Sequence, residues 1–516
     1  MSSRAARLAL FVGAALISGF TILRGGAPFD EGLVLQAARR VADGEVPYRD
    51  FQWAYGPADA YLLGGWFKAF GVSLLSWRIL RVVCDAVVAV LVYELVRRGA
   101  PRWIALVAWL ATACAMAQPT SASPGAPTLV FAFAGLAVAT RTPPDRRAPA
   151  LAGVLVGIAL LWRLDFGLYA AGAVGIALLV TSQPLRERLR AVGVFSACTT
   201  AVALIGYLPF IVAAGPADFY EAILGRSLTE RDYWTLPFPL SYDGSVGVWP
   251  PGQALDDAKD LVNYYVPALL VAGLVLVGAA LAVIAWRRRR LDPAAAGLIT
   301  FAVGGLLYLY SRADEFHTAP MLVALTAALG LAWAALRAPE FGRAGRAAAA
   351  GLLALLVLLA GTGLANRLSA LLRPPALAAI DLPGTQGAKA PPAEARALRR
   401  TVRAVQARVP PDQPIYTVTR RSDLVRFNQP VLYVLAQRDN ATAVDFGLQT
   451  SPRAQRRLVA QLRRARPRVV VRWLDPITTV REPNLRGKPS GSRALDEYLA
   501  RAYRPGPRYG QYRLLL

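Results

Sequence analysis

The sequence predicts a polytopic α-helical membrane protein with an α/β domain at its C-terminus, and two observations indicate this fold class. The 516 residues are 55% hydrophobic and 18% charged, and their mean hydropathy is +0.38. A soluble domain carries about a quarter charged residues. The apolar residues also fall in blocks of roughly 17 to 25, the length of a bilayer-spanning helix. A disordered chain, a coiled coil and a single soluble domain are therefore excluded.

Eleven apolar blocks predict eleven spanning helices, which form a transmembrane region over residues 1–365. We expect these helices at about 5–23, 78–96, 103–117, 127–140, 149–162, 166–181, 191–214, 263–286, 294–310, 318–336 and 347–365.

Six arginine clusters fall on the same side of the membrane when the eleven spans are counted through. They are Arg4 and Arg7; Arg97, Arg98 and Arg102; Arg141, Arg146 and Arg147; Arg186, Arg188 and Arg190; Arg287 to Arg290; and Arg337, Arg343 and Arg346. Short loops rich in Arg stay in the cytoplasm. The sequence thus predicts a bacterial inner-membrane protein with a cytoplasmic N-terminus and an extracytoplasmic C-terminal domain.

Two long connections between spans, residues 24–77 and 216–262, are expected on the outer side. In the first connection, Asp30 can cap a helix that ends before Gly44. Its apolar residues share one face, which predicts a helix lying on the membrane surface. The apolar stretch 58–70 is too short to span, and we expect it in the interface.

The C-terminal segment is predicted to comprise a linker at 366–391 and an α/β domain at 392–516, because helical periodicity there alternates with short apolar strands. The chain carries a net charge of +25, and residues 366–516 hold 28 basic and 10 acidic residues. Two interpretations stay open for this basic segment: a gene rich in G and C, or a surface that faces anionic lipid headgroups or an anionic polymer. Nucleic acid is not expected as a partner of an extracytoplasmic segment.

Acidic residues just outside the first span are candidates for catalysis. The carboxylate of Asp30 or Glu31 could take a proton from an acceptor hydroxyl at the membrane surface. Asp30 is also a candidate ligand for Mg²⁺ or Mn²⁺, which would neutralise a phosphate leaving group. The alternative is that Asp30 only caps its helix.

Further ionisable residues gather at the outer ends of the spans, where charged side chains are costly and often functional. The candidates for phosphate binding are Arg78, Arg81, Arg163 and Arg312, because a guanidinium can bind phosphate bidentately. The candidates for substrate binding are Asp50, Tyr55, Asp165, Asp314 and His317. Alternatively these residues reach water or pair locally, as Arg163 could with Asp165.

Several of these residues lie in segments that carry a family resemblance. The segments are Phe29-Asp30-Glu31-Gly32, Val46-Pro47-Tyr48-Arg49-Asp50-Phe51, Tyr55-Gly56-Pro57 and Trp162-Arg163-Leu164-Asp165-Phe166-Gly167. They resemble GT-C membrane glycosyltransferases, the enzymes related to aminoarabinose transferases, protein mannosyltransferases (glycosyltransferase family 39) and lipopolysaccharide sugar transferases of rhizobia. The resemblance implies that Asp30 is the base or a metal ligand, and that Arg78 is the arginine opening the next span.

Two departures from that family pattern concern the donor phosphate. Many relatives have His-Lys-Pro-Pro where this chain has Ala54-Tyr55-Gly56-Pro57, so a phosphate-binding lysine is absent. Many also have an acidic residue where this chain has Ser121-Ala122-Ser123-Pro124-Gly125. The arginines at the outer helix ends would therefore have to hold the phosphate.

The sequence favours an inverting transferase of hexosyl or pentosyl groups. It would move a sugar from a polyprenyl-phosphate donor to a glycan, lipid or protein of the cell envelope. Neither a P-loop nor a dinucleotide fingerprint is found. The alternatives are a lipid-linked glycan ligase or flippase-like carrier without transfer chemistry at Asp30, and a non-catalytic envelope scaffold. Transporters tend to place polar residues near the midplane, whereas these lie at the outer face, which favours the transferase.

Overall fold

The structure is a computed structural model of the whole chain. It describes residues 3–26, 30–118, 125–141, 145–225, 228, 235–242, 244, 246–247, 249–314, 317–424, 428–445, 451–475 and 491–516. For residues 3, 30 and 251 it describes the backbone alone.

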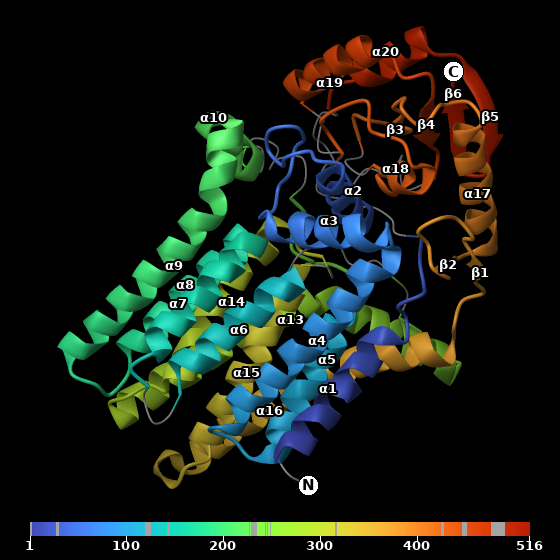
Figure 1. Cartoon of the computed structure of the whole chain (residues 1–516). Coiled ribbons are helices and arrows are strands. Elements are labelled where there is room, and N and C mark those ends of the chain that lie inside the picture. The colour runs from blue at the N-terminus through green and yellow to red at the C-terminus, as the bar shows by residue number, and fades with distance from the viewer. Residues whose placement is uncertain are drawn as a thin grey trace.

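A bundle of long helices forms most of the molecule, and each predicted span coincides with one of them (Figure 1). These helices are α1 (Ser3–Gly19), α4 (Leu74–Arg97), α5 (Arg102–Met116), α6 (Gly125–Ala139), α7 (Ala148–Trp162), α8 (Leu164–Leu179), α9 (Leu185–Ala214), α13 (Pro251–Arg288), α14 (Pro293–Ser311), α15 (Ala319–Leu336) and α16 (Gly342–Leu372).

Among the described residues, five of these helices are long and apolar enough to cross a membrane by themselves, namely α9, α13, α14, α15 and α16. Helices α5 to α8 are apolar but only 15 or 16 residues long. The protein is therefore a multi-pass membrane protein, as predicted. The count of eleven crossings and the inside–outside orientation stay predictions.

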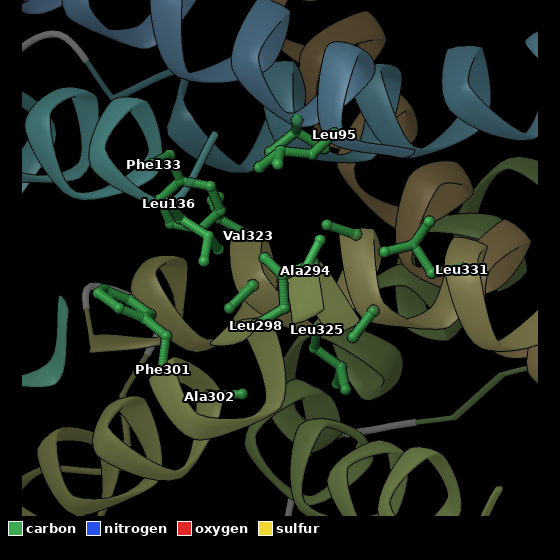
Figure 2. Close-up of a cluster of buried hydrophobic side chains, with 14 of the residues drawn as sticks. Leu95, Phe133, Leu136, Ala294, Leu298, Phe301, Ala302, Val323, Leu325 and Leu331 are labelled. Atoms are coloured by element: carbon green, nitrogen blue, oxygen red, sulfur yellow. The ribbon is translucent and has the colours of Figure 1, made fainter. Parts of the chain in front are cut away.

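The core of the bundle is apolar and closely packed around α14 and α15. Figure 2 shows Leu298 and Phe301 of α14 beside Val323 and Leu325 of α15, with Phe133 of α6 against them. Glycine allows α14 to approach its neighbours: a Cβ at position 297 would lie 2.5 Å from the Leu136 side chain. Small residues at helix contacts are typical of membrane bundles.

Two shorter helices, α2 (Asp30–Ala42) and α3 (Ala58–Phe70), lie at one end of the bundle, and the N-terminus lies at the other (Figure 1). Helix α2 ends as predicted, before Gly44, which has a φ of +97°. It does not lie on a membrane surface, because it is buried between α3 and the C-terminal segment. Helix α3 keeps Leu62, Trp66 and Phe70 exposed, which suits the interface position predicted for it.

Between α9 and α13 the described residues include a short helix α10 (Pro216–Tyr220) and a π-helix η1 (Glu221–Gly225). A 3₁₀ turn, η3 (Pro339–Phe341), precedes α16.

The C-terminal segment contains helices and a four-stranded mixed sheet (Figure 1). Its helices are α17 (Pro392–Gln406), α18 (Val431–Ala436), α19 (Pro452–Ala465) and α20 (Ala494–Ala502). Its strands are β3 (Tyr416–Thr419), β4 (Val470–Trp473), β5 (Pro505–Tyr509) and β6 (Tyr512–Leu515), in the order β3-β4-β6-β5. Strands β3 and β4 are parallel, and the other two pairings are antiparallel.

Side chains along the strands alternate between the two faces of this sheet, and each face packs against helices. Val471 and Leu514 share a core with α17 and α18, whereas Val418 and Val470 share one with α19 and α20. Successive strand residues point to opposite faces, so four short apolar strands can bury helices on both sides.

The predicted linker at 366–391 contains ordered structure. Its first residues belong to α16, which continues to Leu372. Strands β1 (Ala378–Ala379) and β2 (Lys389–Ala390) then form an antiparallel ladder. The Lys389 amide donates to the Leu23 carbonyl at 2.7 Å, so this segment is fastened to the end of the first helix. That residues 392–516 are a separate extracytoplasmic domain stays a prediction.

Candidate functional site

Arg163 occupies the turn between α7 and α8, where its extended backbone separates the two helices. Its Nε and Nη2 donate to the two carboxylate oxygens of Asp165, at 2.7 and 2.9 Å. The guanidinium also lies over the rings of Phe166, Tyr308 and Tyr55, at 4.1, 4.4 and 5.5 Å from their centroids. Cations are attracted to aromatic faces, so three rings and one carboxylate fix this arginine.

Tyr308 joins Arg163 to the connection between α14 and α15. Its hydroxyl accepts from Arg163 Nη1 at 3.4 Å, and its ring lies 4.5 Å from the ring of His317. His317 Nδ1 is 2.6 Å from Asp314 Oδ1, and Arg312 Nε donates to Asp314 Oδ2 at 2.6 Å. Burial would raise the pKa of Asp314, but its pairs with His317 and Arg312 outweigh that effect and lower it.

These contacts unite six predicted site residues in one group, which we call the outer arginine cluster. Its members are Tyr55, Arg163, Asp165, Tyr308, Arg312, Asp314 and His317. Tyr308 is the one member that the sequence did not single out, because it lies inside an apolar helix with no charged neighbour in the chain.

The loop that brings Tyr55 to the cluster is docked on the end of α7. The Gly56 amide donates to the Trp162 carbonyl at 3.2 Å, and the indole of Trp53 donates to the Gly56 carbonyl at 2.9 Å. The Tyr48 hydroxyl donates to the Tyr55 carbonyl at 2.7 Å. A Cβ at position 56 would lie 1.9 Å from the Leu161 carbonyl oxygen, so only glycine permits this approach.

An apolar groove of about 490 Å³ lies beside the cluster, between α7, α8, α9 and η1. Leu160 and Leu164, which flank Arg163 in the chain, both line it. Two polar groups that line the groove form hydrogen bonds to the backbone: the Tyr207 hydroxyl donates to the Leu160 carbonyl, and the Thr199 hydroxyl donates to the Phe195 carbonyl. The groove therefore offers an apolar surface lined by the two residues that lie close to Arg163 in the chain, Leu160 and Leu164.

Glu31 of α2 and Arg78 of α4 form a second ion pair. Both side chains are 0% exposed, with contacts of 2.6 and 2.8 Å. Arg78 also donates to the Ile22 and Gly25 carbonyls at 2.8 and 2.9 Å. Burial raises the pKa of Glu31 despite the opposing effect of Arg78. The pair thus joins α2 and the segment after α1 to α4, and the roles predicted for both residues at the site stay predictions.

Three other predicted site residues also lie outside the cluster. The backbone of Asp30 begins α2, but its side chain is outside the described residues. Arg81 is buried, lies 3.8 Å from Asp85 and donates to the Gln118 carbonyl at 3.4 Å. Asp50 orders its own loop: it pairs with Arg49, which lowers its pKa, and accepts from the Val46 amide at 2.8 Å.

The metal ligand predicted at Asp30 is a side chain outside the described residues, as are Glu315 and residues 121–124. Among the side chains that the structure describes, no three of His, Cys, Asp or Glu come together in a way that could hold one ion. Binding of Mg²⁺ or Mn²⁺ at Asp30 stays a prediction.

Sequence reasoning also missed Asp59, a buried carboxyl in α3. Its Oδ1 accepts from the Ala60 amide at 2.8 Å, and its Oδ2 has no hydrogen-bond partner among the described residues. Burial raises the pKa of Asp59 to about 8. The signal available in the sequence was one acidic residue inside the apolar stretch 58–70.

Comparison with known proteins supports this architecture. Residues 55–212, which include Tyr55 and Arg163, match the family model described as dolichyl-phosphate-mannose-protein mannosyltransferase. No curated protein sequence matches the chain.

Solved structures share the fold along nearly the whole chain. ArnT from Cupriavidus metallidurans in the apo state is 16% identical, with a TM-score of 0.55 over 100% of this chain and 98% of that one. The same enzyme bound to undecaprenyl phosphate is 15% identical, with a TM-score of 0.54 over 98% and 97%. The archaeal oligosaccharyltransferase AglB from Archaeoglobus fulgidus, in complex with an inhibitory peptide and a dolichol-phosphate, is 14% identical, with a TM-score of 0.51 over 92% and 70%.

The chain is thus a multi-pass membrane protein whose fold is similar to that of ArnT and AglB. Within it, residues 55–212 are similar to the dolichyl-phosphate-mannose-protein mannosyltransferase family.

Proposed function

We propose that the protein transfers a sugar from a polyprenyl-phosphate donor to a hydroxyl acceptor at the outer face of a bacterial inner membrane. One observation carries this proposal: two arginines, Arg163 and Arg312, belong to one cluster, and Leu164, the next residue after Arg163, lines an apolar groove. A polyprenyl-phosphate sugar has the complementary form, with an anionic head on a long apolar chain.

The groove suits the apolar chain of the donor, and the outer arginine cluster suits its phosphate. The side chains of Arg163 and Asp165 are 9% and 36% exposed, so this pair, unlike Arg78–Glu31, keeps some contact with the surface. Guanidinium groups bind phosphate through charge-assisted hydrogen bonds. The undecaprenyl phosphate bound to ArnT and the dolichol-phosphate bound to AglB support this ligand class for the present chain.

The reaction requires a base on the acceptor side and charge stabilisation on the donor side. The acceptor oxygen attacks the anomeric carbon while the bond from that carbon to the phosphate oxygen breaks, so the configuration inverts. The acceptor proton passes to a carboxylate, for which we propose Asp30 at the start of α2. The polyprenyl phosphate leaves with the bonding electron pair, and Arg163 and Arg312 stabilise the charge it gains.

The acceptor is a glycan, lipid or protein of the cell envelope in this proposal, and the sugar is a hexose or a pentose. The C-terminal domain lies on the same outer side, where the acceptor would be found. Figure 1 places this segment at the end of the bundle that carries α2 and α3, which supports a common working face.

Purified protein offered radiolabelled polyprenyl-phosphate sugars tests the proposal. We expect label in an envelope acceptor with wild-type protein and a loss of at least about tenfold with Arg163→Gln. Arg288→Gln is the matched control, because Arg288 also pairs with a carboxylate, Glu340, and lies over a ring, Phe341. A carrier or scaffold would give no labelled product, and equal activity of the two variants would remove Arg163 from the site.

A further inference from the structure

Arg39 in α2 is held by the C-terminal segment. Its Nη1 donates to the carbonyls of Tyr433 and Arg438, at 3.0 and 2.8 Å. Its Nη2 donates to Asp439 Oδ1 at 2.6 Å. All three partners lie about 400 residues away in the sequence. Residues of the C-terminal segment therefore bind α2 near its C-terminal end, opposite the end at which Asp30 lies.

Arg40, the next residue of α2, binds the same segment on another side. Its Nη1 donates to Asp445 Oδ2 at 2.9 Å, and its Nε donates to Glu45 Oε2 at 2.7 Å. Asp445 is 1% exposed, and its second oxygen accepts from the Asn440 side chain at 2.8 Å. Consecutive helix residues point about 100° apart. Residues 433–445 thus bind two arginines that point in different directions from the helix.

The same loop reaches the connection that carries Tyr55. The Gln52 amide donates to the Ala443 carbonyl at 2.8 Å, three residues before Tyr55. Helix α18, whose six residues are all buried, packs against α2 and shares one apolar core with Leu33, Val34 and Trp53. The C-terminal segment thus contacts both parts of the first outer connection that enter the proposed site.

We propose that residues 428–445 of the C-terminal segment position the first outer connection for catalysis, with Arg40 and Asp445 as positioning residues. They act through the helix that presents Asp30 and through the loop that presents Tyr55. The proposal rests on the proposed function, in which Asp30 is the base. It makes the first outer connection and the C-terminal segment a single working unit.

Hydrogen exchange tests the mechanical part of this proposal without any assay of transfer. Asp445→Asn keeps the size of the side chain and an oxygen for Asn440 but removes the charge that holds Arg40. We expect backbone amides of residues 36–52 to exchange at least about tenfold faster in this variant. Glu45→Gln is the matched control, because it takes a carboxylate from the same arginine within the first outer connection, and we expect a change below about twofold. Equal exchange in the two variants would overturn the proposal.

Kinetics in the Asp30→Asn background test the catalytic part. In the wild-type background, we expect Asp445→Asn to lower kcat about tenfold and to leave the donor KM within about twofold. If Asp445 acts through Asp30, adding Asp445→Asn to Asp30→Asn should cost nothing more. Independent, multiplying losses would overturn the positioning role. Full activity of Asp30→Asn alone would instead overturn the base assigned in the proposed function.

A milder variant keeps the proposal testable if Asp445→Asn does not fold. Asp439→Asn removes the partner of Arg39 that is 60% exposed, so folding is expected to survive. The same two measurements should then change in the same direction by a smaller factor. No change in either of them would overturn the proposal.

Discussion

Two arginine–carboxylate pairs, Arg78–Glu31 and Arg163–Asp165, have nearly the same contact distances and different surroundings. Arg78 and Glu31 meet at 2.6 Å, and Arg163 and Asp165 meet at 2.7 Å. The first pair is 0% exposed and is completed by backbone carbonyls, whereas the second is partly exposed, bordered by aromatic rings and next to an apolar groove. Residue type and spacing suggest a site in both places, but accessibility separates a structural pair from a pair that a ligand can reach.

The largest expected effect comes from breaking the buried pair. Arg78→Ala leaves the Glu31 carboxylate buried without its counter-ion, which costs about 3–5 kcal/mol of stability. We expect a marked fall in the unfolding temperature of the detergent-purified protein. Replacing both partners, as in Arg78→Met with Glu31→Leu, should restore part of the lost unfolding temperature, because no unpaired buried charge is left. A stable Arg78→Ala protein that has lost only donor affinity would reverse the roles of the two pairs.

The second prediction concerns the accessible pair. Arg163→Lys keeps the charge but loses the planar fork that can meet a phosphate bidentately. We expect kcat/KM for the donor to fall about tenfold, or about 1.4 kcal/mol, just below the range of about 1.5–3 kcal/mol for hydrogen bonds to charged groups. The unfolding temperature should stay close to that of the wild type. A fall in unfolding temperature as large as that of Arg78→Ala would make Arg163 a structural residue too.

The third prediction concerns the loop that carries Tyr55 and Gly56 and its effect on the transfer rate. Gly56→Ala would force a Cβ against the Leu161 carbonyl oxygen and displace Tyr55 from the guanidinium, at a cost of about 1–3 kcal/mol. We expect a loss in kcat/KM measured with the same transfer assay. Gly65→Ala in α3 is the control, since a Cβ there meets nothing within 4 Å. Equal activity of both variants would show that the docking of the loop does not matter.

Asp59 extends the comparison to a carboxyl without an ion pair, and its effect is read from the pH profile of stability rather than at one pH. Its pKa is about 8 in the folded protein and 3.8 as the ordinary value. The folded state thus holds a proton that the unfolded state releases, so stability from this group is full below about pH 4 and is lost as the pH rises towards 8. The slope is about 1.4 kcal/mol per pH unit. Asp59→Asn should flatten the pH dependence of the unfolding temperature, and an unchanged profile would contradict the buried neutral acid.

Much of the fold could be predicted from the sequence because the membrane imposes it. Apolar blocks of the right length located every helix of the bundle, and Gly44 located the end of α2. The surroundings of α2 could not be predicted. Its partners, Tyr433 to Asp445, are about 400 residues away, and the pattern of one apolar face fits a membrane surface as well as a protein core.

Part of the outer arginine cluster could be named from the sequence. Arg163, Asp165, Arg312, Asp314 and His317 were candidates because ionisable residues stand out at the ends of apolar helices, and Tyr55 lies in a segment that carries the family resemblance. Tyr308 was missed because a tyrosine inside an apolar helix is unremarkable until the fold brings Arg163 to it. The difference between Arg78 and Arg163 was also beyond the sequence, since it depends on which carbonyls and rings surround each guanidinium.

Titration of a polyprenyl phosphate into the purified protein tests the central claim most directly. We predict saturable binding to the wild type, a Kd at least about tenfold higher for Arg163→Gln, and a Kd within about twofold of wild type for Arg288→Gln. Saturable binding that Arg163→Gln leaves unchanged would contradict the assignment of the donor phosphate to the outer arginine cluster.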